Sequence, residues 1–240
     1  MSRFPALCLC LLLGCFPAAA EGPADAAASA PAVAMLRYGG GKSGECFSKR
    51  FLARFNEATD AAVAEEMPKV EAKSIDPTEH RVALLTGEGR FSWKPGEAEN
   101  LRAFLAGGGL LVASTGCSDP GWTGSLEAGL PELLPPGGGY GPLEDLPVEH
   151  PAFGRIFPVP VSDYVKGPPR KPTLLGSHRA DGTLAFVWSP EGLNDTLGVQ
   201  PPCCCCGGNE VRSAAELLVN LLAIGYDAGP AAAAAPAASE

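Results

Sequence analysis

The chain has 240 residues, a formal net charge of −9 and 46% hydrophobic residues, which fits one globular domain with a sizeable core. The acidic balance, and the lack of any Lys/Arg stripe with interleaved aromatic residues, argue against nucleic acid as a partner.

Residues 1–20 have the features of an export signal. Arg3 supplies a positive charge, and the apolar run over residues 4–16 is too short to span a bilayer comfortably. Ala18 and Ala20 are the small residues that signal peptidase recognises. This pattern predicts cleavage near Ala20.

A lipoprotein signal is the alternative, because the residues before Cys15 resemble a lipobox. Cleavage after residue 14 would leave Cys15 acylated as the first residue, and an uncleaved anchor is a third alternative. All three place the domain outside the cytoplasm, as a secreted or periplasmic protein or a membrane-anchored lipoprotein. We expect no transmembrane helix in the mature chain.

Two Ala/Pro-rich segments flank the rest of the sequence. Residues 21–34 and 229–240 have almost no large apolar side chains, so neither segment buries enough surface to order itself. Both are expected to be disordered, the first as a linker and the second as a tail. The residues between them, 35–228, form the predicted domain.

Apolar runs and helical stripes alternate along this domain. Short apolar runs predict strands, whereas apolar residues three or four positions apart predict helices. Strands are expected at 33–38, 70–75, 82–86, 110–114, 173–177 and 183–188, the last two forming a hairpin through Asp181-Gly182. Helices are expected at 47–58, from Pro95 to the glycines at 107–109, around 126–134, and at 211–224.

Residues 84–119, together with residues 36–40 and 150–153, resemble the bacterial family called domain of unknown function 4159. The resemblance and the order of elements imply an α/β fold with a three-layer, open, mostly parallel sheet and helices on both faces. That arrangement is similar to the class I glutamine amidotransferase-like and flavodoxin-like folds.

In an open α/β sheet, ligands bind beyond the carboxyl ends of the strands. This rule selects the loops at 39–43, 86–89, 115–119 and 189–191. The candidate ligand-binding residues in these loops are Gly39, Gly40, Gly41, Lys42, Thr86, Glu88, Ser118 and Glu191.

The first of these loops superficially resembles a phosphate loop. Leu36 stands where the first glycine of that motif is required, so the spacing argues against nucleotide hydrolysis. A general anion or carboxylate nest and a plain tight turn both remain open.

Amidotransferases of the similar fold use a cysteine on a sharp turn and a histidine in a later His-Pro-Glu segment. Cys117 follows a strand of the right kind, but the later segment reads Ser189-Pro190-Glu191. The base is therefore missing. His150 and His178 are possible substitutes, and the alternative is a structural or disulfide-bonded Cys117.

Glu88 lies between two glycines at a strand end where the family commonly has histidine. As a base, Glu88 would be paired with Asp119 or Glu191, and the pairing would raise one pKa. A hydrolase built around Glu88, Cys117, Asp119 and His150 is thus one candidate, against an ordinary exposed glutamate.

Three aromatic residues are candidates for a sugar-binding face. These residues are Trp93, Trp122 and Tyr140, and the alternative is that they anchor loops.

Four consecutive cysteines precede the last helix. Of the nine cysteines, removal of the three in the leader leaves six, an even number in an oxidising compartment, which favours disulfides. The candidates are Cys46, Cys117, Cys203, Cys204, Cys205 and Cys206. A copper(I) or zinc site is the alternative, although four adjacent thiolates fit one metal ion poorly.

The interpretation that we prefer is a non-catalytic ligand- or protein-binding module of the bacterial envelope with a degenerate amidotransferase-like site. Its partner is expected to be an envelope protein or a small polar ligand. The hydrolase and a thiolate metal-binding protein remain as alternatives, and no cofactor is expected.

Overall fold

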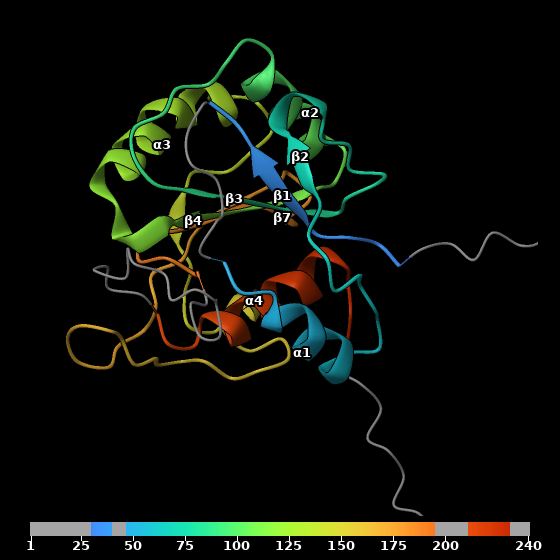
Figure 1. Ribbon diagram of the computed structural model, residues 1–240, viewed down its shortest axis with the longest axis vertical. Coiled ribbons are helices and arrows are strands. Elements are labelled where there is room, and N and C mark those ends of the chain that lie inside the picture. Colours follow the sequence, from blue (N-terminus) through green and yellow to red (C-terminus); the bar gives the residue numbers. More distant parts are fainter. Residues whose placement is uncertain (1–29, 40–46, 195–210, 231–240) are drawn as a thin grey trace, which may run out of the picture.

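A computed structural model describes residues 30–39, 47–194 and 211–230 of the chain (Figure 1). The strands form one mixed seven-stranded sheet in the order β2-β1-β3-β4-β7-β6-β5. Strands β2, β1, β3, β4 and β7 are parallel, β6 is antiparallel to β7, and β5 is antiparallel to β6. The bounds are β1 Ala34–Arg37, β2 Lys69–Glu71, β3 Val82–Gly87, β4 Leu110–Thr115, β5 Glu144–Asp145, β6 Leu175–His178 and β7 Leu184–Ser189.

The two central strands, β3 and β4, are buried along their whole length. Successive side chains of a strand point to opposite faces, so a strand covered on both sides reads as an unbroken apolar run. Val82 and Leu84 belong to one hydrophobic cluster, and Ala83 and Leu85 belong to the other. The sequence-based prediction of a central parallel strand covered on both faces is confirmed.

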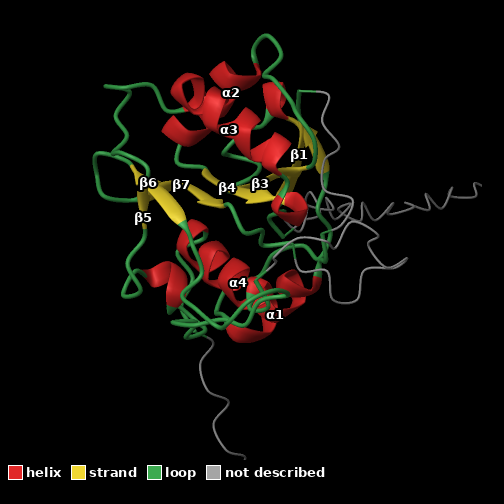
Figure 2. Cartoon of the chain, turned by 90° about the vertical axis from the view of Figure 1, so that its left-hand side faces the viewer, coloured by secondary structure: helices red, strands yellow, loops and turns green. Residues whose placement is uncertain are grey.

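Helices cover both faces of the sheet (Figure 2). Helices α1 (Arg50–Ala58) and α4 (Ala214–Gly225) lie on one face, and α2 (Glu97–Ala106) and α3 (Pro120–Leu133) lie on the other. The α/β class predicted from the sequence is therefore confirmed, in the form of a mixed sheet.

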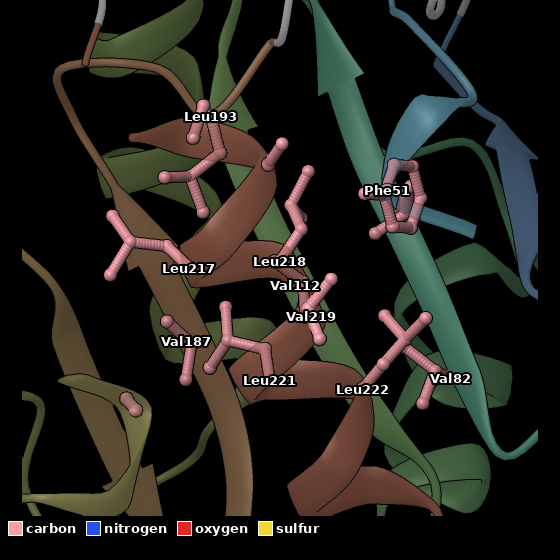
Figure 3. Packing of buried hydrophobic residues seen from close by; sticks show 14 of the residues in the cluster. Phe51, Val82, Val112, Val187, Leu193, Leu217, Leu218, Val219, Leu221 and Leu222 are labelled. Carbon is pink, nitrogen blue, oxygen red and sulfur yellow. The ribbon is translucent and has the colours of Figure 1, made fainter. Parts of the chain in front are cut away.

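Helix α4 packs its leucines onto the sheet (Figure 3). Leu218, Leu221 and Leu222 are fully buried in the cluster that contains Val82 and Val187. Each such side chain contributes about 1.5–3 kcal/mol relative to an exposed one. The burial of these leucines holds α4 against one face of the sheet.

Two helix starts differ from expectation. Helix α3 begins at Pro120, several residues before the expected position, because the Asp119 side chain accepts a hydrogen bond from the Trp122 backbone N–H at 2.7 Å. Helix α2 begins at Glu97, and the buried Glu97 carboxylate accepts hydrogen bonds from the backbone N–H groups of Lys94 and Gly39. Glu97 is itself the first residue of α2, whereas capping side chains are usually sought at the N-cap position before the helix.

The smaller elements show where the sequence patterns were weak. The expected strand at 70–75 is strand β2 followed by a 3₁₀ turn at Ala72–Ser74, and the predicted hairpin is confirmed as β6 and β7. Strand β5 lies in a Pro/Gly-rich segment where no strand was expected, because two residues carry no periodic signal.

Candidate functional site

Gly39, just after β1, and the loops after β3, β4 and β7 lie at one edge of the sheet, which we call the carboxyl edge. The Gly89 backbone N–H donates to Asp119 Oδ1 at 3.2 Å, and the Ser118 hydroxyl donates to the Glu191 backbone oxygen at 3.3 Å. Gly39 has a φ of 52° and its N–H donates to Glu97. The chain therefore brings together the described parts of the expected loops.

The turn after β4 is sharp. Cys117 and Ser118 both have left-handed backbone conformations, with φ values of 50° and 51°. Such residues cost on the order of 1–3 kcal/mol each and occur where the surrounding structure imposes them. A Cβ at Gly116 would lie 2.6 Å from the Gly87 carbonyl oxygen, so only glycine allows this approach of the two strand ends. The two left-handed residues and the close strand ends together make the turn at Cys117 sharp.

A carboxylate lies beside the thiol at this turn. The Cys117 thiol donates to Glu88 Oε1 at 3.4 Å, and both side chains are partly exposed. Asp119 is on the same turn. Its Oδ1 atom accepts hydrogen bonds from the N–H of Trp122, at the start of α3, and from the N–H of Gly89, in the loop after β3. Glu88, Cys117 and Asp119 are thus neighbours, as the sequence suggested.

The histidines lie at the opposite edge. The chain has three, and all are among the described residues. His80 precedes β3 and contacts the Ala32 backbone oxygen at 2.8 Å, while the Nε2 atoms of His150 and His178 are 3.3 Å apart. These positions place every histidine near the amino ends of the parallel strands.

The length of β7 separates His150 from the cysteine turn. His178 is the register partner of Leu184, which begins β7, whereas Ser189 ends that strand. Five residue steps of about 3.3 Å put roughly 16 Å between the two edges. The structure therefore does not bring His150 or His178 to Cys117, and the hydrolase site expected around Glu88, Cys117, Asp119 and His150 is not assembled as a unit.

Ser189 is the residue for which the expected resemblance to amidotransferases predicts a histidine. The residue is fully buried, and its hydroxyl has no hydrogen-bond partner among the described residues. Across the sheet, Ser114 accepts from the Leu193 N–H at 2.7 Å and donates to Asn194 Oδ1 at 2.5 Å. Thr86, an expected ligand contact, is buried and also donates to Asn194 Oδ1, at 3.3 Å. The carboxyl end of β7 is therefore buried in the interior of the protein.

Glu191, the last residue of the Ser-Pro-Glu segment, is committed to internal contacts. Its carboxylate accepts hydrogen bonds from the Tyr164 hydroxyl at 2.7 Å and the Thr173 N–H at 2.9 Å, and it pairs with Arg170 at 2.8 Å. Arg170 stacks over the Tyr164 ring at 3.6 Å from its centroid. Burial, and next the neighbouring Glu191, raise the pKa of Tyr164. No motif in the sequence points to these partners of Glu191.

A cavity of about 440 Å³ opens beside the cysteine turn. Arg90 and Phe91 line it from the loop after β3, and Gly121, Gly124 and Ser125 line it from α3. A Cβ at Gly124 would meet no atom within 4 Å, so the small residues of α3 leave this space open. Arg90 is exposed and supplies a positive charge at this cavity. A small polar molecule fits this chemistry.

The expected aromatic face is not assembled. Trp122 is fully buried and its indole N–H donates to the Tyr38 hydroxyl, while the Trp93 indole N–H donates to the Gly129 backbone oxygen at 3.2 Å. Tyr140 donates to the Arg102 backbone oxygen at 3.5 Å. These contacts are those of loop anchors.

Several expected site residues lie outside the described residues. They are Gly40, Gly41, Lys42, the lipidation candidate Cys15, and the disulfide candidates Cys46, Cys203, Cys204, Cys205 and Cys206. In the described ranges, no group of three or more His, Cys, Asp or Glu side chains is placed to hold a metal ion. None of the helices in those ranges combines the length and the apolar character that a membrane span needs.

A comparison with protein families matches residues 32–224 to the domain of unknown function called DUF4159. The match covers most of the chain, including every described strand and nearly all of α4. A comparison with curated proteins found no match. The chain belongs to the DUF4159 family.

Proposed function

We propose that this chain is a non-catalytic ligand-binding module of the bacterial envelope. In this proposal the sheet is amidotransferase-like and its catalytic site has degenerated. The supporting observation is the buried Ser189 in the position of the base, with all three histidines at the other edge of the sheet. Without a base, a thiol with a reference pKa near 8.5 stays mostly protonated at neutral pH.

The ligand in this proposal is a small polar molecule bound in the cavity beside the cysteine turn. Arg90 lines this cavity and offers a guanidinium, while the carboxylates of Glu88 and Asp119 lie on the neighbouring loops at the strand ends. Charges of both signs around small residues suit a zwitterionic or hydroxyl-rich molecule that both donates and accepts hydrogen bonds. An envelope protein that presents such groups is the alternative partner.

The envelope location rests on the leader. Arg3, the apolar run after it and the small residues near Ala20 support export, and Cys15 supports a lipid anchor as the alternative. Intact-mass measurement of the native protein should show a chain that starts near residue 21 or an acylated chain that starts at Cys15. Recovery of the unprocessed chain from the cytoplasm would contradict this location.

A pair of glycine substitutions tests the cavity. Gly124→Leu should fill the cavity, and it adds a better helix former, so the fold is expected to persist. Gly154→Leu is the control, because a Cβ at Gly154 also meets no atom within 4 Å but lies after the 3₁₀ turn at Pro151–Phe153, outside α3. Crosslinking in envelope membranes should capture less of a bound molecule with Gly124→Leu than with the control. Equal capture by both variants would count against the cavity.

A glutamine hydrolysis assay tests the lack of catalysis. We expect no turnover. Turnover that disappears in Cys117→Ala and survives in Cys203→Ala would show that the thiol is catalytic and would overturn the proposal.

The second candidate is a hydrolase that uses the cysteine turn without histidine. The left-handed turn at Cys117 and the 3.4 Å contact with Glu88 favour it. Screening with small esters and amides separates the two functions, because a hydrolase would lose activity in Glu88→Gln whereas a binding module has none to lose. The thiolate metal-binding alternative rests on the cysteine run alone and is tested by zinc or copper(I) titration of the reduced chain.

A further inference from the structure

A second cavity, of about 660 Å³, lies at the edge of the sheet opposite the cysteine turn. Arg81, Leu110 and Leu184, which lie at the starts of β3, β4 and β7, contribute to its wall. His150 and His178 line the same cavity. The site proposed above uses none of these residues.

The contacts of His150 identify its tautomer. The Ala152 backbone N–H donates to His150 Nδ1 at 3.1 Å, so that nitrogen carries no hydrogen. A neutral imidazole then carries its proton on Nε2. This N–H points to His178 Nε2 at 3.3 Å, which must accept. The two rings therefore share one proton between facing nitrogens.

This arrangement argues against a metal ion bound by the two histidines. A neutral imidazole that binds a metal through Nε2 carries its proton on Nδ1. In His150 that proton would point at the Ala152 N–H, and the hydrogen bond at the start of the 3₁₀ turn would be lost. The pair is instead suited to carry protons.

Two arginines of the cavity are held by backbone carbonyl groups. Arg179 donates to the backbone oxygens of Leu105, Gly109 and Leu184, and Arg155 donates to the Ala228 oxygen and to Asp227. These contacts counter the negative ends of α2 and α4, which face the cavity.

The remaining charges leave the cavity positive. Asp181 accepts hydrogen bonds from Thr183, and Asp227 pairs with Arg155. Arg81 is exposed, and no hydrogen bond of its side chain to another described residue occurs. The cavity is lined by three arginines and two aspartates. Its net charge is therefore +1 when both imidazoles are neutral.

Protonation changes what the histidine pair offers. If the histidine pair carries one more proton, both Nε2 atoms bear hydrogen and face each other across 3.3 Å. Two facing N–H donors repel unless an acceptor with negative charge joins them. Burial, and next the neighbouring His178, lower the pKa of His150. An anion that accepts from both nitrogens would offset this penalty.

We propose that this cavity binds an oxyanion together with a proton, against the paired imidazoles of His150 and His178, with Arg81 as a further cation of the cavity wall. The ligand is a group with two or more negative oxygens, either a carboxylate or a sulfate- or phosphate-like ion. Because proton and anion bind together, the affinity falls as the pH rises through the imidazole range. This site does not depend on the ligand proposed for the other edge.

Sulfate is the first probe, because its charge stays constant over the imidazole range. Calorimetry should show sulfate binding at least ~10-fold tighter near pH 5.5 than near pH 8. His178→Gln and Arg81→Gln should each weaken binding near pH 5.5, whereas His80→Gln, which changes a histidine outside the cavity, should not. Acetate in place of sulfate identifies the preferred oxyanion.

The imidazole resonances give a readout that needs no variant. In NMR titrations of the wild-type chain near pH 5.5, added sulfate should shift the imidazole resonances of His150 and His178 and leave those of His80 in place. The proposal is overturned if sulfate binds equally at both pH values, if His80→Gln weakens binding as much as His178→Gln, or if all three histidines respond alike.

Discussion

Ser114 and Ser189 are register partners on β4 and β7, and both are buried, yet within the described part of the chain only the Ser114 hydroxyl has hydrogen-bond partners. The two hydroxyls therefore differ in what their removal does. Ser189→Ala should leave the free energy of unfolding unchanged or raise it slightly, because a buried hydroxyl without a partner costs free energy. Ser114→Ala should lower it by about 1–3 kcal/mol, since the Leu193 N–H and Asn194 Oδ1 each lose that partner. Urea unfolding of the two variants measures the difference, and equal losses would contradict it.

Asp119 should act as the helix cap of α3. Its carboxylate accepts from the N–H groups of Trp122 and Gly89, so Asp119→Ala removes two acceptor contacts. We expect a loss of about 0.5–2 kcal/mol in the free energy of unfolding. Asp119→Asn keeps an oxygen acceptor and is the matched control. A loss of the same size in both variants would point to the charge of Asp119 instead of the cap.

Glu191 should stabilise the fold through its three partners. Glu191→Gln removes the charge while keeping the shape, which weakens the contacts with Tyr164, Arg170 and the Thr173 N–H. A loss of about 1–3 kcal/mol in the free energy of unfolding is expected. Glu127→Gln, an exposed change on α3, should cost less than about 0.5 kcal/mol. A Glu191→Gln variant as stable as the wild-type chain would contradict this role and would leave the carboxylate available to a ligand.

His150 should make the fold sensitive to acid. Burial and His178 lower the pKa of His150 in the folded chain, so the unfolded chain takes up the proton first as the pH falls below about 6.5. The contribution to stability is thus present above that pH and is lost as the pH falls through the folded pKa. Urea unfolding near pH 8 and near pH 5.5 should give a smaller difference in His150→Asn than in the wild-type chain. Asn keeps an acceptor for the Ala152 N–H, and a pH dependence unchanged by the substitution would assign the acid sensitivity to other groups.

The cysteine run should be oxidised in the exported protein. The described chain reaches Asn194 at the carboxyl edge, close to the end of β4 that precedes Cys117. We therefore expect one or two bridges that reach Cys46 or Cys117, each worth roughly 3–5 kcal/mol in the chain-entropy model. Peptide mapping without reduction measures them, and six thiols in protein purified from the envelope would contradict the prediction.

Much of the fold could be predicted because its strongest patterns are periodic. The buried strands at 82–86 and 110–114 and the hairpin at 173–188 were placed within a few residues. The early start of α3 was missed because a single side chain, Asp119, determines it.

The candidate site was predicted only in part. The rule for strand ends depends on topology alone, and it selected the loops from which Glu88, Cys117 and Asp119 come close together. It gave no means of placing His150, which comes from a loop and lies beside a strand that runs antiparallel to the others. The contacts of Glu191 with Tyr164 and Arg170 join distant segments without a local pattern.

The outer strands of the sheet bear on how molecules of this protein meet one another. Strand β2 has three residues, Lys69 to Glu71, and β5 has two, Glu144 and Asp145, which are both exposed acids. Short edges with charged side chains are poor templates for pairing with the backbone of another chain. Concentrated solutions of the folded chain should therefore resist growth into aggregates through continuous intermolecular sheets.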